Sequence, residues 1–195
     1  MKDNERTYMM SDSLLGLVLD DRFEIVEYVA KGGMGEIYKA IQRPLNRVVA
    51  IKRLSDSSEE YSDEFRKRFF LEASLCGRLT HPNIIRIFDY GCHDEIIYYI
   101  AMEYLEGQTL QQLVKKEGTL EPGMAVSILK QICAGLVEAH DAGLVHRDLK
   151  PANIFVVPNA LGGEFIKILD FGVVKELNPD KDIELSLSKT TLGSP

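Results

Sequence analysis

The sequence predicts an α+β protein of two lobes, the first built on an antiparallel sheet with one helix and the second mainly helical. Residues 22–103 contain short segments with apolar residues at alternating positions, and one segment with helical spacing. Beyond residue 107 the longest regular pattern has the period of an α-helix. We therefore expect a flexible leader over residues 1–21, an N-terminal lobe over 22–103, a hinge over 104–107 and a C-terminal lobe over 108–195.

The first lobe is expected to contain five strands and one helix. The first two strands form a hairpin whose connection, Lys31–Gly35, is unusually rich in glycine, and the third strand, Arg47–Lys52, is β-branched. Helical spacing predicts a helix over residues 59–79, which ends at His81-Pro82-Asn83 because proline disfavours the helical conformation in the residue before it. The last two strands are expected near Ile84–Tyr90 and Ile96–Met102.

The second lobe is expected to contain one long helix, Pro122–Ala142, with proline in its first turn. Two short apolar runs, Asn153–Val157 and Phe165–Leu169, predict strands on either side of a loop. The apolar face of the helix is predicted to comprise Ala125, Ile128, Leu129, Ile132, Leu136 and Ala139.

Composition excludes several classes of protein. With 30 acidic and 23 basic residues the net charge is -7, which argues against a general nucleic-acid binder. The cysteines Cys76, Cys92 and Cys133 form no CxxC pair, so they predict neither a disulfide framework nor a zinc site, and scattered thiols suit the cytoplasm. No apolar run approaches the roughly 18 residues of a membrane span, and the acidic leader argues against a secretory signal.

Three features of the first lobe could serve phosphate binding. Glycines in the hairpin connection allow backbone N–H groups to approach phosphate oxygens, although such a connection is more often only a tight turn. Lys52 ends a strand, and most lysines are solvated surface charges. Glu72 lies on the apolar side of its predicted helix, which is costly unless a cation pairs with it. Lys52 is the natural partner for Glu72.

The second lobe carries a more specific pattern, His146-Arg147-Asp148-Leu149-Lys150-Pro151-Ala152-Asn153, followed by Asp170-Phe171-Gly172. Asp148, Asn153 and Asp170 supply oxygen atoms from neighbouring loops. Hard cations such as Mg²⁺ prefer oxygen ligands and are commonly shared with substrate phosphates. This pattern predicts a site for a divalent cation and a phosphorylated ligand.

In this order, the glycine turn, Val49-Ala50-Ile51-Lys52, the helix glutamate, His146–Asn153 and Asp170–Gly172 resemble the eukaryotic-type protein kinases. Gly-Gly-Met-Gly-Glu-Ile-Tyr at 32–38 and His-Pro-Asn-Ile-Ile at 81–85 are similar to the bacterial serine/threonine branch. The resemblance extends from Leu15 to Pro195, and Ala30 stands where the family has its first glycine. It implies a protein-kinase-like fold truncated after the activation loop. The helix at 122–142 would then expose an apolar patch.

The resemblance also implies a role for each matching residue. Asp148 accepts the proton of the substrate hydroxyl, and Lys150 neutralises charge on the transferred phosphoryl group. Lys52, paired to Glu72, holds the α and β phosphates, while Asn153 and Asp170 hold Mg²⁺. The implied ATP-binding residues are Val29, Ala30, Gly32, Gly33, Gly35, Ile37, Ala50, Lys52, Met102, Glu103, Leu105 and Phe155.

Arg147, beside Asp148, implies control by a phosphorylated residue of the activation loop, because a guanidinium pairs with phosphate through two hydrogen bonds. Thr190 and Thr191 are the first candidates, followed by Ser186 and Ser188, and the alternative for each is an unmodified loop residue. Lys150 in the Asp-Leu-Lys-Pro-x-Asn pattern resembles kinases that act on serine and threonine rather than tyrosine.

The resulting prediction is a cytoplasmic serine/threonine protein kinase that uses ATP and Mg²⁺, acts on protein hydroxyls including its own activation loop, and self-associates to do so. A second hypothesis is an ATP-binding interaction module without turnover, suggested by the missing platform for a protein substrate. A third is a phosphotransferase for small molecules, which Arg147 and the hydroxyl-rich tail disfavour.

Overall fold

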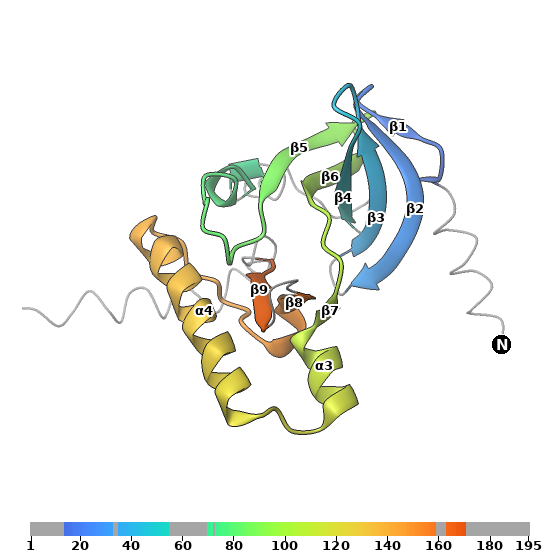
Figure 1. The fold of residues 1–195 in the computed structure, drawn as a ribbon. Coiled ribbons are helices and arrows are strands. Elements are labelled where there is room, and N and C mark those ends of the chain that lie inside the picture. Colours follow the sequence, from blue (N-terminus) through green and yellow to red (C-terminus); the bar gives the residue numbers. More distant parts are fainter. Residues whose placement is uncertain (1–13, 33–34, 55–69, 72, 159–162, 171–195) are drawn as a thin grey trace, which may run out of the picture.

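The computed structural model describes residues 14–32, 35–54, 70–71, 73–158 and 163–170. Figure 1 shows an N-terminal sheet above a lower part that contains two helices and a small second sheet. This architecture confirms the predicted α+β fold with an antiparallel sheet in its first lobe. No helix within the described ranges has the length and apolar character needed to cross a membrane.

The N-terminal sheet has six antiparallel strands in the order β1-β2-β3-β4-β6-β5. The sheet therefore has one strand more than the sequence predicted. The additional strand is β1, which is only two residues long and is too short for an alternating pattern to reveal. The strands are β1 (Val18–Leu19), β2 (Phe23–Gly32), β3 (Gly35–Gln42), β4 (Arg47–Leu54), β5 (Ile87–His93) and β6 (Ile97–Glu103).

The core of this sheet begins before the predicted end of the leader. Leu14 and Leu19 are buried against Phe23 and Ile25, and the backbone N–H of Gly16 donates to the Ile25 carbonyl at 2.9 Å. Residues 14–21 are thus part of the lobe, and residues 1–13 lie outside the described ranges. Burying two leucine side chains here stabilises the fold by roughly 3–6 kcal/mol.

The helix predicted over residues 59–79 is described only in its last turns, at 70–71 and 73–76. It ends where the N–H of Gly77 donates to the Ala73 carbonyl at 2.9 Å. The next strand, β5, begins later than predicted, at Ile87 rather than Ile84. Ile85 explains the difference, because its N–H donates to the Ile168 carbonyl at 2.9 Å in the lower part of the molecule. A contact distant in sequence has replaced the expected strand pairing.

The lower part combines a three-stranded sheet, β7-β8-β9, with helices α3 and α4. Sequence periodicity did not reveal α3, although the chain carries a capping box at its start: the Gln112 N–H donates to Thr109 Oγ1 at 3.1 Å, and the Thr109 N–H donates to Gln112 Oε1 at 2.8 Å. The elements are β7 (Gln108–Thr109), α3 (Leu110–Glu117), α4 (Pro122–Asp141), the 3₁₀ turn η2 (Pro151–Asn153), β8 (Ile154–Pro158) and β9 (Glu164–Ile168).

Helix α4 packs against β9 through a face close to the predicted one. Its buried residues are Ile128, Ile132, Gly135 and Ala139, and a Cβ at Gly135 would stand 2.9 Å from Ile168 Cδ1. Leu129 was wrongly placed on this face, since its side chain is 59% exposed. One residue along a helix rotates the side chain by about 100°, which turns Leu129 away from the face that carries Ile128. The exposed apolar side chains of α4 are Val126, Leu129 and Val137.

A buried asparagine joins the segment before β5 to the lower part. Asn83 Nδ2 donates to the Ile166 carbonyl at 2.8 Å and to Gln131 Oε1 at 3.0 Å. Asn83→Ala should lower the free energy of unfolding by about 1–3 kcal/mol, because two hydrogen bonds of a buried amide are lost, while Gln131 Oε1 still accepts from the Ile166 N–H. Urea denaturation measures this loss. Gln111→Ala on the exposed side of α3 is the control, and an equal effect of the two changes would contradict the assignment.

Candidate active site

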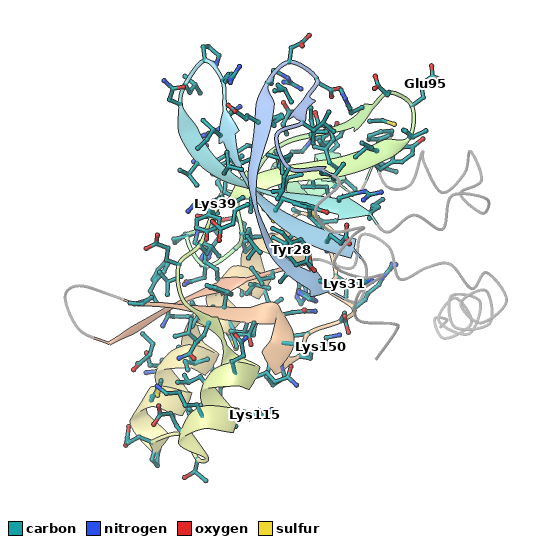
Figure 2. All side chains as sticks on the ribbon, turned by 90° about the vertical axis from the view of Figure 1, so that its right-hand side faces the viewer. Tyr28, Lys31, Lys39, Glu95, Lys115 and Lys150 are labelled. Atoms are coloured by element: carbon teal, nitrogen blue, oxygen red, sulfur yellow. The ribbon has the colours of Figure 1, made fainter. Side chains whose placement is uncertain are left out.

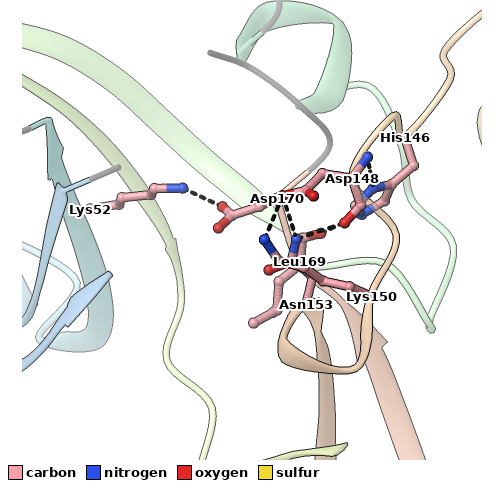
Figure 3. Close-up of polar contacts among 7 residues, drawn as sticks. All are labelled: Lys52, His146, Asp148, Lys150, Asn153, Leu169 and Asp170. Atoms are coloured by element: carbon pink, nitrogen blue, oxygen red, sulfur yellow. Dashed lines mark hydrogen bonds and ion pairs between the residues drawn. The ribbon is translucent and has the colours of Figure 1, made fainter. Parts of the chain in front are cut away.

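The loop from His146 to Asn153, between α4 and β8, is fixed to the end of β9 by a buried histidine. His146 Nε2 donates to the Leu169 carbonyl at 2.8 Å, and its Nδ1 accepts the Asp148 N–H at 3.3 Å. These two bonds fit the tautomer that carries its proton on Nε2. His146 thereby holds the loop beside the residue that follows Leu169, which is Asp170 (Figure 3).

Asn153 organises the same loop from within. Its Nδ2 donates to the Asp148 carbonyl at 2.9 Å and to Asp148 Oδ2 at 3.2 Å, and its own N–H donates to the Lys150 carbonyl at 2.9 Å. The Leu169 N–H donates to the Asn153 carbonyl at 2.8 Å, which brings Asp170 to the same side. Because Asp148 takes the amide nitrogen, the side-chain oxygen of Asn153 is the atom it can offer to a cation.

The carboxylate of Asp148 is held between two donors. Lys150 Nζ lies 2.9 Å from Asp148 Oδ2, the oxygen that also accepts from Asn153. The Asp148 side chain is 14% exposed and that of Lys150 is 50% exposed. A carboxylate fixed in this way keeps one orientation, with the exposed ammonium group of Lys150 on its outer side.

Lys52 and Asp170 bring the two lobes together. Lys52 Nζ, from β4, lies 2.5 Å from Asp170 Oδ1, although the two residues are 118 positions apart (Figure 3). The Lys52 side chain is 10% exposed and that of Asp170 is 42% exposed. The predicted pair between Lys52 and Glu72 cannot be compared with this one, since Glu72 lies outside the described residues.

The donors at this end of the site fit Mg²⁺. Asp170 supplies a carboxylate that solvent can reach, and Asn153 supplies an amide oxygen from the adjoining loop. Both are hard oxygen ligands, and Mg²⁺ typically takes one or two such ligands and fills its remaining positions with water and phosphate.

Several of the predicted ATP-binding side chains form one apolar cluster. Ile37, Ala50, Met102 and Leu105 pack together between the lobes. The cluster has three members that sequence reasoning did not find, namely Ile85, Tyr104 and Leu169. Leu169 had a usable signal, because it directly precedes Asp170 at the end of an alternating strand. An apolar cluster next to hard oxygen ligands is suited to a ligand with one flat apolar end and one charged end.

The glycine-rich hairpin ends beside β4. Gly32 pairs with Gly35, whose φ is 153°, and a Cβ at Gly35 would stand 1.9 Å from the Arg53 carbonyl oxygen. Only glycine permits that approach. The predicted neighbours Val29 and Ala30 lie on β2 and are exposed. Gly33 lies outside the described ranges.

Glu103 uses its side chain as well as its backbone. Its Oε1 accepts from Lys167 Nζ at 2.6 Å and from the Arg86 N–H at 2.7 Å. Sequence reasoning missed Lys167, whose pairing partner is 64 positions away.

Phe155 of β8 is half-buried, and its ring reaches to 3.1 Å from where a Cβ at Gly107 would stand.

The predicted regulatory residues are only partly described. Arg147 is exposed and has φ of 57°, a left-handed conformation that costs free energy in a residue other than glycine. Arg147 directly precedes Asp148 in the sequence. Thr190 and Thr191 lie outside the described residues.

Known proteins share this architecture. The chain is 39% identical over 165 residues to a probable serine/threonine-protein kinase of Clostridium perfringens, covering 85% of this chain and 23% of that protein. The solved PknI kinase domain of Mycobacterium tuberculosis matches with a TM-score of 0.71 and 30% identity, covering 83% of this chain and 63% of that one. Rad53 in complex with AMP-PNP matches with a TM-score of 0.67 and 29% identity, covering 79% and 39%.

The chain thus spans about a quarter of the length of the curated relatives that it matches. The PknI match confirms the predicted protein-kinase-like fold. A family profile described as the protein kinase domain matches residues 23–195, most of the sequence. The chain therefore belongs to the protein kinase family.

Proposed function

We propose that the chain is the nucleotide-binding and catalytic part of a serine/threonine protein kinase, which transfers the γ-phosphoryl group of Mg-ATP to hydroxyl groups of proteins. The observation that carries this proposal is the meeting of Lys52, Asp148 and Asp170 at one site, together with the loop contacts of Asn153. The names of the bacterial relatives support the choice of serine and threonine over tyrosine.

Asp148 is the group that positions and deprotonates the substrate hydroxyl. Its carboxylate is fixed by Asn153 and Lys150, so the hydroxyl oxygen can be aimed at the γ-phosphorus. As the new oxygen–phosphorus bond forms, the bond between the γ-phosphorus and the oxygen leading to the β-phosphate breaks, ADP leaves and the proton passes to Asp148. Lys150, half exposed at the mouth of the site, offsets the negative charge of the moving phosphoryl group.

Asn153 and Asp170 would hold Mg²⁺, which neutralises phosphate charge when bound. Lys52, with its predicted partner Glu72, would hold the α and β phosphates under the backbone of Gly32, Gly33 and Gly35. In the structure Lys52 pairs with Asp170, so binding of Mg-ATP would exchange this contact for contacts to phosphate and metal.

Adenine would lie between Ile37 and Ala50 on one side and Phe155 on the other, beside the apolar cluster, with Met102 behind it. The backbone of Glu103 and Leu105 would bind its edge, and we place the hinge at residues 104–107. Val29 and Ala30 would line the rim.

Regulation would act through the activation loop. Arg147 would pair with a phosphate on Thr190 or Thr191, added by a second copy of the kinase. We propose a signalling role in the cytoplasm, where ATP is available and where the free thiols of the described cysteines are chemically stable.

Two measurements on the chain test this function. Calorimetry should detect ATP binding that strengthens when Mg²⁺ is added, and mass spectrometry should find phosphoserine or phosphothreonine on a generic protein or on the chain itself. Binding without transfer would favour the interaction module. Transfer to a metabolite but never to protein would favour a small-molecule phosphotransferase, and a folded chain that binds no Mg-ATP would overturn the proposal.

Lys52→Met should weaken the affinity for Mg-ATP roughly 10- to 100-fold, because a buried charged donor to phosphate is lost. The matched control is Lys115→Met, which removes an exposed lysine in the last turn of α3. Calorimetric titration of both variants makes the comparison. Equal affinities for the two variants would contradict the role of Lys52.

A further inference from the structure

A buried ion pair lies directly behind the glycine-rich hairpin. Arg53 Nη1 of β4 stands 3.3 Å from Glu36 Oε2 of β3, and the two side chains are 11% and 14% exposed. They occupy paired positions on adjacent strands. An ion pair this well buried gives little stability over a well-packed apolar pair, because removing both charges from water costs as much as their attraction returns. Its location therefore calls for a reason other than stability.

A tyrosine, Tyr38, connects this ion pair to β2. Tyr38 is fully buried, and its hydroxyl donates to Glu36 Oε2 at 2.8 Å. Its ring meets that of Tyr28 on β2 edge to face, with centroids 5.5 Å apart. Burial, and then the hydrogen bond and charge of Glu36, raise the pKa of Tyr38, which keeps the phenol a donor at neutral pH. Together Glu36, Tyr38 and Arg53, here named the hairpin anchor, link β2, β3 and β4.

The hairpin anchor is continuous with both parts of the predicted phosphate site. Glu36 follows Gly35, where an added Cβ would stand 1.9 Å from the Arg53 carbonyl oxygen, and Arg53 follows Lys52. Figure 2 shows Lys31 at the lower end of this hairpin, on the side of the lower lobe that carries Lys150. A shift of Glu36 relative to Arg53 would therefore move the backbone of the hairpin relative to Lys52.

We propose that Glu36, Tyr38 and Arg53 are positioning residues that hold the glycine-rich hairpin at a fixed distance from Lys52 and thereby set the affinity for nucleotide. The inference rests on the proposed function, since it assumes that the hairpin covers phosphates. Along β3 and β4 these side chains alternate with Ile37 and Lys52, so they lie on the face of the sheet opposite the proposed nucleotide-binding residues. The charged pair fixes the register of the hairpin end more narrowly than apolar packing would, because its contacts depend on direction.

Two variants and one matched control test the anchor. Tyr38→Phe removes the hydroxyl and keeps the ring, while Glu36→Gln removes the charge and keeps an acceptor for Tyr38. The control Glu27→Gln breaks an exposed pair with Lys39 on the same hairpin, where the atoms are 3.8 Å apart. Amide hydrogen exchange is measured without nucleotide at the hairpin end, including Gly35, and calorimetry measures the affinity for Mg-ATP.

Both anchor variants should speed exchange at the hairpin end roughly tenfold and weaken nucleotide affinity about three- to tenfold, with no change in Glu27→Gln. Unchanged exchange would overturn the anchor. If exchange rose equally across the sheet and α4, the three residues would contribute only general packing stability. If exchange rose only at the hairpin end and the affinity for Mg-ATP stayed the same, the proposed effect on nucleotide binding would be wrong. If the unaltered chain bound no Mg-ATP, the proposed function and this link would fail together, while the exchange data would still decide whether the anchor exists.

Discussion

Asp148→Asn should lower the rate of phosphoryl transfer about 10²- to 10⁴-fold while the affinity for Mg-ATP stays nearly unchanged. Asparagine has the shape of aspartate and keeps an oxygen for the Asn153 amide, so the loop contacts seen in the structure are largely retained. It cannot accept a proton from the substrate hydroxyl. The change therefore separates the proton-accepting role of Asp148 from its structural one.

Release of ADP and incorporation of phosphate into protein measure the rate, and calorimetry measures binding. Asp141→Asn, at the exposed end of α4, removes the same charge elsewhere and should leave both quantities as they are. Transfer at the unaltered rate in Asp148→Asn would show that another group accepts the proton. If Asp148→Asn lost both ATP binding and phosphoryl transfer, Asp148 would act mainly by supporting the loop.

The elements that were predicted correctly are those indicated by patterns of residues close together in the sequence. The β4 strand was predicted from a β-branched run that ends on Lys52. In the structure Val49 and Ile51 lie in the sheet core and Lys52 pairs with Asp170. The long helix α4 is marked by its period and by Pro122 at its start. Each of these signals depends on neighbours within a few positions, which is why the bounds of these elements came out close.

The elements that were missed or displaced depend on distant contacts. Ile84 and Ile85 have the composition of a strand, yet Ile84 forms only an isolated parallel bridge with Ile168 in the other lobe. The Ile85 N–H donates to the Ile168 carbonyl, and β5 starts after both residues. The strand β1 exists because Leu19 finds a place in a core assembled from later strands. Helix α3 is different, since its capping box was readable in Thr109 and Gln112 and was overlooked.

The site was predicted through resemblance, and its unpredicted members show why spacing alone is insufficient. No pattern in the sequence places Lys52 beside Asp170, because only the packing of the two lobes joins them. The pairing of Lys167 with Glu103 and the packing of Leu169 into the apolar cluster likewise depend on the packing of the two lobes. Such contacts become visible once the fold is known.

Asp170→Asn should remove most of the gain in ATP affinity that Mg²⁺ provides, a loss of roughly 100-fold in excess Mg²⁺. Asp170 has φ of 42°, and asparagine tolerates this left-handed conformation better than other residues except glycine. The backbone is therefore kept, and the change removes only the charge of one carboxylate. Without that charge Lys52 loses its ion pair with Asp170, so metal-free ATP should bind at least as tightly as before.

Calorimetric titrations with and without Mg²⁺ give this comparison, with Asp148→Asn as the matched control. Both substitutions remove one carboxylate charge from the same site, so a general electrostatic effect would act on both alike. If Asp170 is a metal ligand and Asp148 a proton acceptor, the two variants should behave differently. In Asp170→Asn the affinity for ATP should no longer depend on Mg²⁺. In Asp148→Asn that dependence should remain, but phosphate should not be transferred. Full dependence on Mg²⁺ in Asp170→Asn would mean that the ion is held by other oxygens, and the assignment of Asn153 and Asp170 as its ligands would be wrong.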